Sequence, residues 1–409
     1  MRVAIVGSGV SGLVVAHLIQ HRHDITVFEA RDRIGGHVNT IHHEYGGVER
    51  SIDTGFIVYN ERNYPLFTEL LKRLDVPTQP STMSFSVHCD RTGLEYNGST
   101  VRKLFVQKRN LFSPRYYGMI WDILRFNREA PKEILKGVQG LSIGEYLKSG
   151  RYSARMADHY LVPMGSALWS MPSRSVLEMP AEFFVRFFEN HGMLAVNDRP
   201  EWRVIEGGSA RYVKSLIRPF RDRIRTRCPV HTVRRGLGEV LVNGERFDEV
   251  VMACHSDQAL GIIDDPSPEE REVLGALPYQ ENSVVLHTDT DVLPRRRGAW
   301  GSWNYRIQGE PEAPVTVTYN MNMLQTLTAE RTFCVTLNPP DWIDPDAVLY
   351  ETSYRHPLYT LDGIEAQGRH HKISGVNHTH YCGAYWGFGF HEDGVRSAIE
   401  VSSRLGVKL

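Results

Sequence analysis

The sequence predicts an α/β fold in which a domain built on a parallel sheet is interleaved with a second, α+β domain. Three observations lead to this prediction. The apolar run Val3–Val6 suits a buried parallel strand, and a G-x-G-x-x-G turn follows it at once. The acid Glu29 ends the next apolar run, about 20 residues after the glycines. Together they predict a Rossmann-like dinucleotide-binding domain that begins at the second residue.

Each glycine of the turn has a separate expected role. Gly7 permits the tight turn, Gly9 leaves room for a pyrophosphate, and Gly12 lets the following helix pack closely on the strand. Ser11 belongs to the same turn, and Leu13–Ile19 continues as a helix whose N-terminus faces the anion. The phosphates therefore need no lysine.

Glu29 follows the predicted strand Ile25–Phe28. A carboxylate at this place accepts hydrogen bonds from both ribose hydroxyls of an adenosine. A glycine-rich turn alone is a weak signal, but here the strand, the helix and the acid all stand where dinucleotide binding requires them.

The residues after this acid resemble a known family. Glu29-Ala30-Arg31-Asp32-Arg33-Ile34-Gly35-Gly36-His37 is similar to the E-A-x-x-x-x-G-G-R segment of the flavin-containing amine oxidase superfamily, and Asp53-Thr54-Gly55-Phe56 is similar to its D-x-G segment. The resemblance implies an FAD-binding domain of the glutathione-reductase and amine-oxidase type. It places the double glycine under the pyrophosphate and residues 54–56 at the flavin ring. The implied cofactor contacts in this part of the chain are Glu29, Ala30, Arg31, Gly35, Gly36, His37, Thr54, Gly55 and Phe56.

Two positions differ from the family pattern. His37 replaces the usual arginine, so we expect a weaker or pH-dependent phosphate contact, because an ordinary imidazole is mostly neutral at pH 7. Ala384 replaces a common glutamate after Gly383, so one contact to the cofactor is replaced or lost.

The resemblance extends to the C-terminus. Residues 380–394 precede a helix that in the family points its N-terminus at the pyrimidine end of the flavin, where it stabilises the charge of the reduced ring. Gly383, His391 and Glu392 are implied cofactor contacts there. Val230 stands where a strand usually offers backbone groups to the adenine.

Within the superfamily, the chain looks closest to an FAD-binding branch found with cyclopropane fatty acid synthases, and to the N-terminal flavin region of the plant enzymes. The segments that suggest this are residues 53–60, 301–305, 317–322 and 388–394. The resemblance covers nearly the whole chain and implies a lipid acyl chain as substrate.

Composition favours a cytoplasmic enzyme. The net charge of −1 gives no reason to expect a nucleic-acid partner, and no apolar run is long enough to span a bilayer. The five cysteines are odd in number and widely spaced, which fits a reducing compartment. Cys382 lacks the family's covalent-linkage context, so we expect non-covalent FAD.

The cofactor signals divide the chain into interleaved parts. We expect a discontinuous FAD-binding domain at 1–75, 200–260 and 366–409, and a substrate domain at 76–199 and 261–365. In the substrate domain, Ser113-Pro114 opens a helix that Pro131 interrupts, and Ser267-Pro268-Glu269-Glu270 is a capping box. Strands are expected at 283–288, 315–319 and 332–337.

A basic and aromatic stretch runs from Arg102 to Arg128. It holds seven lysines and arginines against one acid, Asp122, interleaved with large apolar side chains. Such a segment can lie in a lipid headgroup layer as a peripheral membrane contact. The alternative is that its apolar side is ordinary core and its basic side is solvated.

Histidines supply the candidate catalytic residues. His287 stands on strand 283–288 where many amine oxidases carry a lysine, and His391 begins the last helix. His378, His380 and Cys382 alternate, but no fourth ligand is visible, so we expect no metal.

The sequence therefore predicts an FAD-dependent oxidoreductase that removes hydride from a small hydrophobic or lipid substrate. Two alternatives remain. One is an amine oxidase that produces hydrogen peroxide, and the other is a non-catalytic flavoprotein partner of a lipid methyltransferase.

Overall fold

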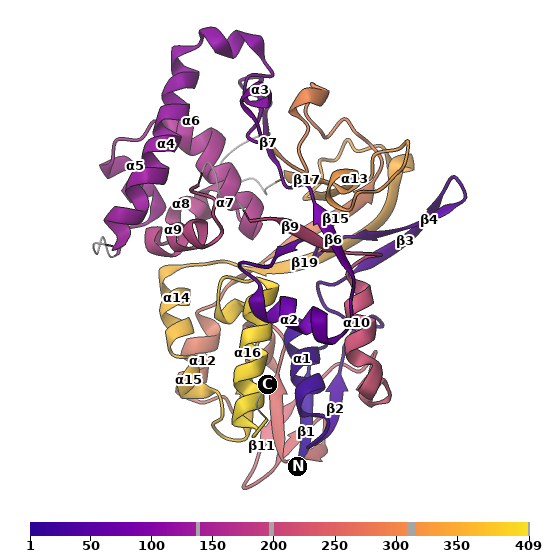
Figure 1. Ribbon diagram of the computed structural model, residues 1–409. Coiled ribbons are helices and arrows are strands. Elements are labelled where there is room, and N and C mark those ends of the chain that lie inside the picture. The colour runs from indigo at the N-terminus through magenta and orange to yellow at the C-terminus, as the bar shows by residue number, and fades with distance from the viewer. Residues whose placement is uncertain (136–139, 196–199, 309–315, 408–409) are drawn as a thin grey trace.

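A computed structural model describes residues 1–135, 140–195, 200–308 and 316–407, which form two lobes (Figure 1). The lower lobe in this view contains both β1 and α16, and the upper lobe contains a large sheet and a group of helices. Five sheets are present in the described ranges.

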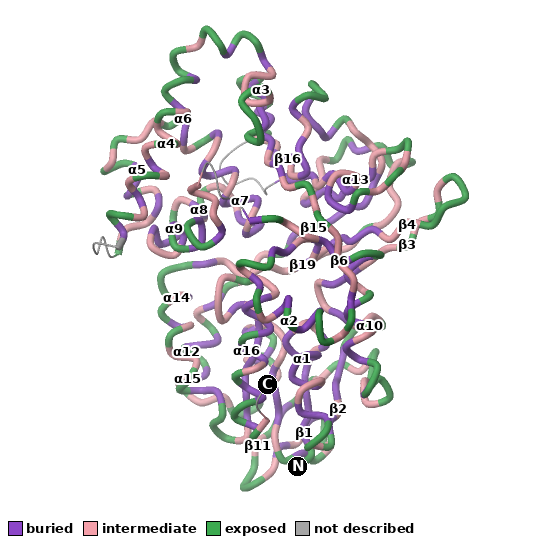
Figure 2. The backbone as a smooth tube through the Cα atoms, in the orientation of Figure 1, coloured by how far each residue is buried: buried purple, intermediate pink, exposed green. Residues whose placement is uncertain are grey.

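The lower lobe is built on a five-stranded parallel sheet with the order β10-β2-β1-β14-β20. Its strands come from all three ranges predicted for the cofactor domain: β1 Arg2–Val6, β2 Asp24–Phe28, β10 Ile224–Arg225, β14 Glu249–Met252 and β20 Thr379–Tyr381. Consecutive residues of β1 face opposite sides of the sheet, and both sides are buried (Figure 2).

Each face of this sheet has its own apolar core. Val3 and Ile5 face a core formed with α1 Val10–Ile19, α2 Pro65–Arg73, α10 Ala210–Ile217 and α16 His391–Arg404. Ala4 and Val6 face a second core, formed with β11 Val233–Arg235, β12 Val240–Val242, β13 Glu245–Phe247, α11 Ser256–Ile262, α12 Pro268–Gly275, α14 Leu361–Gly368 and α15 His370–Ile373.

The second core corrects the predicted domain boundaries. Helices α12 and α14 fall in the range assigned to the substrate domain, yet Val273, Leu274 and Ala366 pack against Ala4 and Val6. The capping box that begins α12 is confirmed, because Glu270 N donates to Ser267 Oγ at 3.1 Å and Ser267 N donates to the Glu270 carboxylate at 2.8 Å.

The upper lobe contains a seven-stranded mixed sheet with the order β19-β15-β18-β17-β16-β7-β8. The predicted strands at 283–287, 316–319 and 334–337 lie in it, whereas Val315 falls outside the described residues. The strands are β7 Phe85–Cys89, β8 Leu94–Asn97, β15 Tyr279–His287, β16 Trp303–Ile307, β17 Thr316–Asn320, β18 Cys334–Leu337 and β19 Val348–Pro357.

Two small sheets connect the lobes: a hairpin of β3 Thr40–Tyr45 with β4 Val48–Asp53, and a three-stranded sheet of β5 Tyr59–Asn60, β9 Trp202–Ile205 and β6 Thr78–Ser81. A further short helix, α13 Met321–Leu324, follows β17.

A group of helices packs beside the large sheet and shares a core with β7 and β8. These helices are α3 Val101–Leu104, α4 Pro114–Leu135, α5 Ile143–Ser149, α6 Ala154–Met156, α7 Val162–Trp169, α8 Ser173–Glu178 and α9 Ala181–Asn190. The predicted interruption of α4 at Pro131 is wrong, since the helix continues to Leu135. A proline this close to the helix end removes a single backbone hydrogen bond, and the buried side chains of Phe126, Ala130 and Ile134 hold the helix against the core.

Candidate functional site

A cavity of about 800 Å³ lies at the carboxyl edge of the parallel sheet, where ligands bind in open α/β folds. Residues that directly follow β1, β2, β14 and β20 line it. Its wall continues into the upper lobe along β15 to β19 and helix α7. One cavity therefore joins the predicted cofactor site to the second domain.

The glycine turn leaves a space at the start of α1. Gly9 has extended backbone angles, φ −71° and ψ 178°, and a Cβ added to it would meet no atom within 4 Å. No side chain caps the first N–H groups of α1. The free amides and the empty volume beside Gly9 fit a pyrophosphate, as predicted.

The other two glycines of the turn are required by close packing. Gly7 has φ +109° and its N–H donates to Phe28 O at 2.8 Å. A Cβ on Gly12 would lie 2.1 Å from Gly7 O, so only glycine allows α1 to approach the turn. Gly12 therefore shapes the turn but does not line the cavity.

Glu29 lies at the cavity wall with its carboxylate held in place. Its Oε1 accepts a hydrogen bond from Arg31 N at 2.9 Å, and its Oε2 accepts from Ser8 N at 3.1 Å and from Ser8 Oγ. A carboxylate has about four acceptor positions and three are occupied, so one remains for a ribose hydroxyl. Ala30, Arg31 and Val230 line the same end, with Val230 in the loop before β11 rather than in a strand.

Replacing Glu29 by alanine tests this assignment. Loss of hydrogen bonds to a charged acceptor, worth roughly 1.5 to 3 kcal/mol, should weaken FAD binding by roughly 10- to 100-fold. Titration of the apoprotein with FAD, followed by flavin fluorescence, measures the change.

The control for this variant is Asp32→Ala, which removes an acid whose side chain is 68% exposed and lies three residues further along. Asp32→Ala should bind FAD like the wild type. Equal affinity of Glu29→Ala and the wild type would refute the placement of the ribose.

The double glycine Gly35-Gly36 lies against the G-x-G-x-x-G turn. Gly35 N donates to Ser8 O at 3.0 Å, and a Cβ on Gly36 would lie 2.9 Å from Gly9 Cα. The loop after β2 therefore closes one side of the space at Gly9. This contact between Gly36 and Gly9 agrees with the place that the family resemblance gave to the double glycine.

Residues 54–56 line the cavity beside the last helix. A Cβ on Gly55 would lie 2.0 Å from His37 O, so the two backbones are in close contact. The Phe56 ring stacks on the His391 ring, with 3.5 Å between centroids. Ser11, Gly383 and His391 also line the cavity, so most predicted cofactor contacts meet there.

His391 begins α16, whose N-terminus points its dipole at the cavity. Its imidazole lies 3.1 Å from the Tyr212 hydroxyl. Burial lowers the pKa of His391 to about 3, so the ring is neutral at pH 7. It can hold a ligand by a hydrogen bond, but it does not supply a charge.

Glu392 is not a cofactor contact. Its carboxylate is buried and accepts hydrogen bonds from Leu66 N at 3.1 Å and Phe67 N at 3.0 Å, so it caps the first turn of α2. Glu392 does not line the cavity. The prediction for this residue is therefore corrected to a structural role.

His287 is also not at the site. Alternation along β15 places Val284 and Leu286 on the side of the cavity and His287 on the opposite side. The His287 ring is fully buried there, 2.7 Å from Thr336 Oγ1. The predicted role of His287 beside the flavin is thus contradicted, and the residue serves strand packing.

Around the predicted residue His37, the cavity is lined by three aromatic side chains that sequence reasoning missed, those of Tyr354, His356 and His255. The His37 ring stacks on Tyr354 at 4.9 Å and lies 5.4 Å from His356 and 6.2 Å from His255. Burial and the neighbouring histidines hold the pKa of His37 well below its usual range. The expected pH dependence of a phosphate contact by His37 is therefore not supported near neutrality.

The upper part of the cavity is mainly apolar. Its wall includes Ile57, Val58, Ala167, Leu168, Phe187, Met193, Val284, Trp303, Tyr319, Val335 and Leu337. Among the lining residues in the described part of the chain, Glu29 is the one acid and there is no lysine. Cys254 lines the wall, and burial raises the pKa of its thiol to about 12. Cys254 is thus a thiol rather than a reactive thiolate at pH 7, which fits non-covalent binding.

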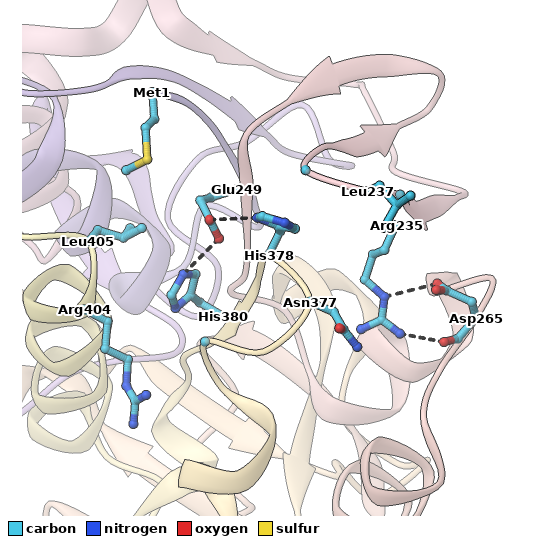
Figure 3. A pocket seen from close by; sticks show the side chains of 13 residues that line it. Met1, Arg235, Leu237, Glu249, Asp265, Asn377, His378, His380, Arg404 and Leu405 are labelled. Atoms are coloured by element: carbon cyan, nitrogen blue, oxygen red, sulfur yellow. Dashed lines mark hydrogen bonds and ion pairs between the residues drawn. The ribbon is translucent and has the colours of Figure 1, made fainter.

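A second cavity, of about 870 Å³, lies at the opposite, amino edge of the parallel sheet (Figure 3). Glu249 stands between His378 and His380 there, at 3.0 and 3.2 Å. Cys382 is buried in the core formed with α1 and α16. Among the described residues, no three His, Cys, Asp or Glu side chains meet in a way that could hold a metal ion.

Three comparisons with known proteins agree on the fold. A family model for flavin containing amine oxidoreductase matches residues 10–311. A protein designated flavin-containing monoamine oxidase AofH, from Mycobacterium tuberculosis strain H37Rv, is 22% identical over 341 residues, covering 78% of this chain and 70% of that protein.

Two solved structures superpose on nearly the whole chain. Putrescine oxidase bound to putrescine has a TM-score of 0.69 and 15% identity, covering 99% of both chains. A CLA-producing fatty acid isomerase from P. acnes has a TM-score of 0.68 and 15% identity, also covering 99% of both chains. At such identities these structures establish the fold alone.

Proposed function

This chain belongs to the flavin-containing amine oxidoreductase family, and on that basis we propose that it takes hydride from an apolar substrate, with a lipid acyl chain as the leading class. The family's cofactor is FAD, and the chain is an FAD-dependent oxidoreductase. Bound FAD supplies the hydride acceptor.

The residues of this chain bind and orient that cofactor. Gly9 and the free amides of α1 would hold the pyrophosphate, and Glu29 the adenosine ribose. The N-terminus of α16 at His391 would face negative charge on the far end of the cofactor. The apolar wall of the upper cavity would keep water away from the reacting atoms.

The observation that carries the proposed substrate class is that no acid lines the upper cavity among the residues that the structure describes. Glu29 is the one acid among the described lining residues, and its carboxylate is engaged by Ser8 and Arg31 at the adenosine end. A cationic amine would lose its hydration there without gaining a carboxylate, whereas an acyl chain gains from apolar burial.

The amine-oxidase alternative would require aromatic rings that flank a slot for the substrate. Trp303 and Tyr319 line the cavity but pack edge to face, with centroids 5.2 Å apart and planes at 89°. The two rings touch each other and leave no slot between them. This arrangement favours the lipid proposal.

The relation to the branch found with cyclopropane fatty acid synthases stays a proposal, as does partnership with a lipid methyltransferase. Both rest on the sequence segments described above. If the chain only supports a methyltransferase structurally, its flavin should not be reduced by any small-molecule donor.

Anaerobic mixing with candidate donors tests the proposal. We expect fatty acids or phospholipids with long acyl chains to bleach the flavin faster than putrescine or other amines. Leu168→Asp, which adds a charge to the apolar wall, should slow bleaching by lipid roughly tenfold or more while FAD stays bound. His287→Gln is the matched control and should react like the wild type.

Two other outcomes of this experiment would each identify a different function. Faster bleaching by amines would identify an amine oxidase. No bleaching by lipids, amines or nicotinamide donors would favour the non-catalytic role.

A further inference from the structure

Large apolar side chains are exposed on α3, on the segment that joins it to α4, and on the N-terminal half of α4. This stretch of chain forms the arch at the top of Figure 1. Phe112 is 87% exposed, Val101 75% and Trp121 66%. Leu111, Tyr117 and Leu124 are also exposed. We call these six side chains the apolar tip. Surface patches of this kind in a water-soluble fold mark interaction sites.

The apolar tip is not part of the protein core. On α4, Tyr117, Trp121 and Leu124 follow the i, i+4, i+7 spacing of one exposed helix face. The buried face of the same helix holds Met119 and Phe126. The helix therefore has a second apolar stripe that its own fold does not cover.

Positive charge surrounds the apolar tip. Arg102, Lys103, Lys108 and Arg115 lie within residues 101–115, and in the described ranges no carboxylate forms an ion pair with them. By contrast, Arg125 is paired with Asp122 at 3.2 Å. These four cations within residues 101–115 are therefore without an ion-pair partner in the described part of the chain, whereas Arg125, further along α4, has one.

A distant part of the chain adds to this charge. Arg295 and Arg297 are exposed beside Gly298, and a Cβ on Gly298 would lie 3.0 Å from the Val106 side chain. The two arginines thus border the same arch although they follow it by almost 200 residues. No acid stands among residues 101–121, and the first one after them, Asp122, is paired with Arg125.

We propose that the apolar tip and its basic border dock this protein on an anionic lipid bilayer. The aromatic and aliphatic side chains would enter the headgroup layer while the cations pair with lipid phosphates. Val101, Leu111 and Leu124 are aliphatic, and this favours a lipid layer over a nucleic acid, whose bases stack on aromatic rings. Among the described residues, no helix is long and apolar enough to cross the bilayer, so the contact is peripheral.

Vesicle co-sedimentation of the FAD-loaded protein tests this docking without any turnover, so the result does not depend on the proposed function. We expect binding to vesicles of phosphatidylglycerol and phosphatidylcholine, at least tenfold tighter than to phosphatidylcholine alone, and weaker binding as salt is raised. Equal binding to both vesicle types, or to neither, would overturn the proposal.

Matched variants locate the contact. Phe112→Ser with Trp121→Ser, and Lys108→Glu with Arg115→Glu, should each reduce binding to anionic vesicles at least tenfold. The controls remove exposed groups of the same kind from the other lobe: Leu237→Ser, at a fully exposed leucine, and Lys214→Glu with Arg218→Glu. The controls should bind like the wild type.

Flavin absorbance in every variant reports that the fold is kept. Wild-type vesicle binding by both tip variants would refute the proposed surface. A change of oligomeric state in Phe112→Ser with Trp121→Ser, with no vesicle binding by any form, would identify the tip as a protein contact instead.

Discussion

Replacing Gly9 by valine is expected to abolish FAD binding while the protein stays folded. The backbone of Gly9 is extended, a conformation that valine adopts readily, and a Cβ there meets nothing within 4 Å. The added methyl groups would instead fill the space that the pyrophosphate needs at the start of α1. The purified variant should therefore be colourless, with roughly a tenth or less of the wild-type flavin content.

Two further glycine variants make this test specific. Gly118→Val places the same side chain on the exposed face of α4, where a Cβ also meets nothing within 4 Å, and should keep its flavin. Gly12→Ala should lower stability, because its Cβ would lie 2.1 Å from Gly7 O. Flavin content is read from absorbance, and folding from circular dichroism. A yellow, folded Gly9→Val protein would mean that the pyrophosphate does not bind at this turn.

The parts of the site that could be predicted from sequence are those made by local backbone geometry. Gly7, Gly9 and Gly12 serve one turn, and each is needed by contacts within a short stretch or with the adjoining strand. Glu29 is the residue directly after β2, so the end of that strand fixes its position. Such positions can be predicted from sequence because the contacts that require them involve residues of the same turn or of the strand next to it.

Side-chain direction and long-range partners could not be predicted. The strand containing His287 was recognised, but the side of the sheet that its imidazole faces depends on which residues of β15 meet the cavity. Glu392 caps α2, more than 300 residues away in sequence. The histidines at positions 37, 255 and 356 come from three separate segments of the chain. No spacing in the sequence predicts that they lie close together.

Stability is expected to fall as the pH is lowered from about 6.5 to about 4. Burial lowers the pKa of several histidines to about 4, and of one to about 3; these are His191, His255, His287, His356, His370 and His391. In the unfolded chain their pKa is near 6.5, so the unfolded state takes up protons in this range that the folded state does not. Each such group lowers the free energy of unfolding by up to about 1.4 kcal/mol per pH unit.

Three buried acids act in the opposite direction, and Glu392 is one of them because burial raises the pKa of its carboxyl. Burial raises the pKa of Asp53 and Asp393 to about 6, so between pH 6 and about 4 the folded state takes up protons first, which stabilises it as the pH falls. The histidines outnumber these acids, so the net change is a loss of stability. With FAD in excess, the melting temperature should be lower at pH 5 than at pH 7.5.

One histidine away from the cofactor cavity tests the cause of this loss. The His370 ring stacks on Trp386 and its Nε2 lies 2.8 Å from Tyr381 O, so glutamine can keep that donated hydrogen bond without taking up a proton. His370→Gln should therefore show a shallower fall in unfolding free energy between pH 6.5 and 5, measured by urea unfolding. The exposed neighbour gives the control, since His371→Gln should keep the wild-type slope. A stability that stays level or rises toward pH 5 in the wild type would show that the buried carboxyls, rather than the imidazoles, dominate proton uptake.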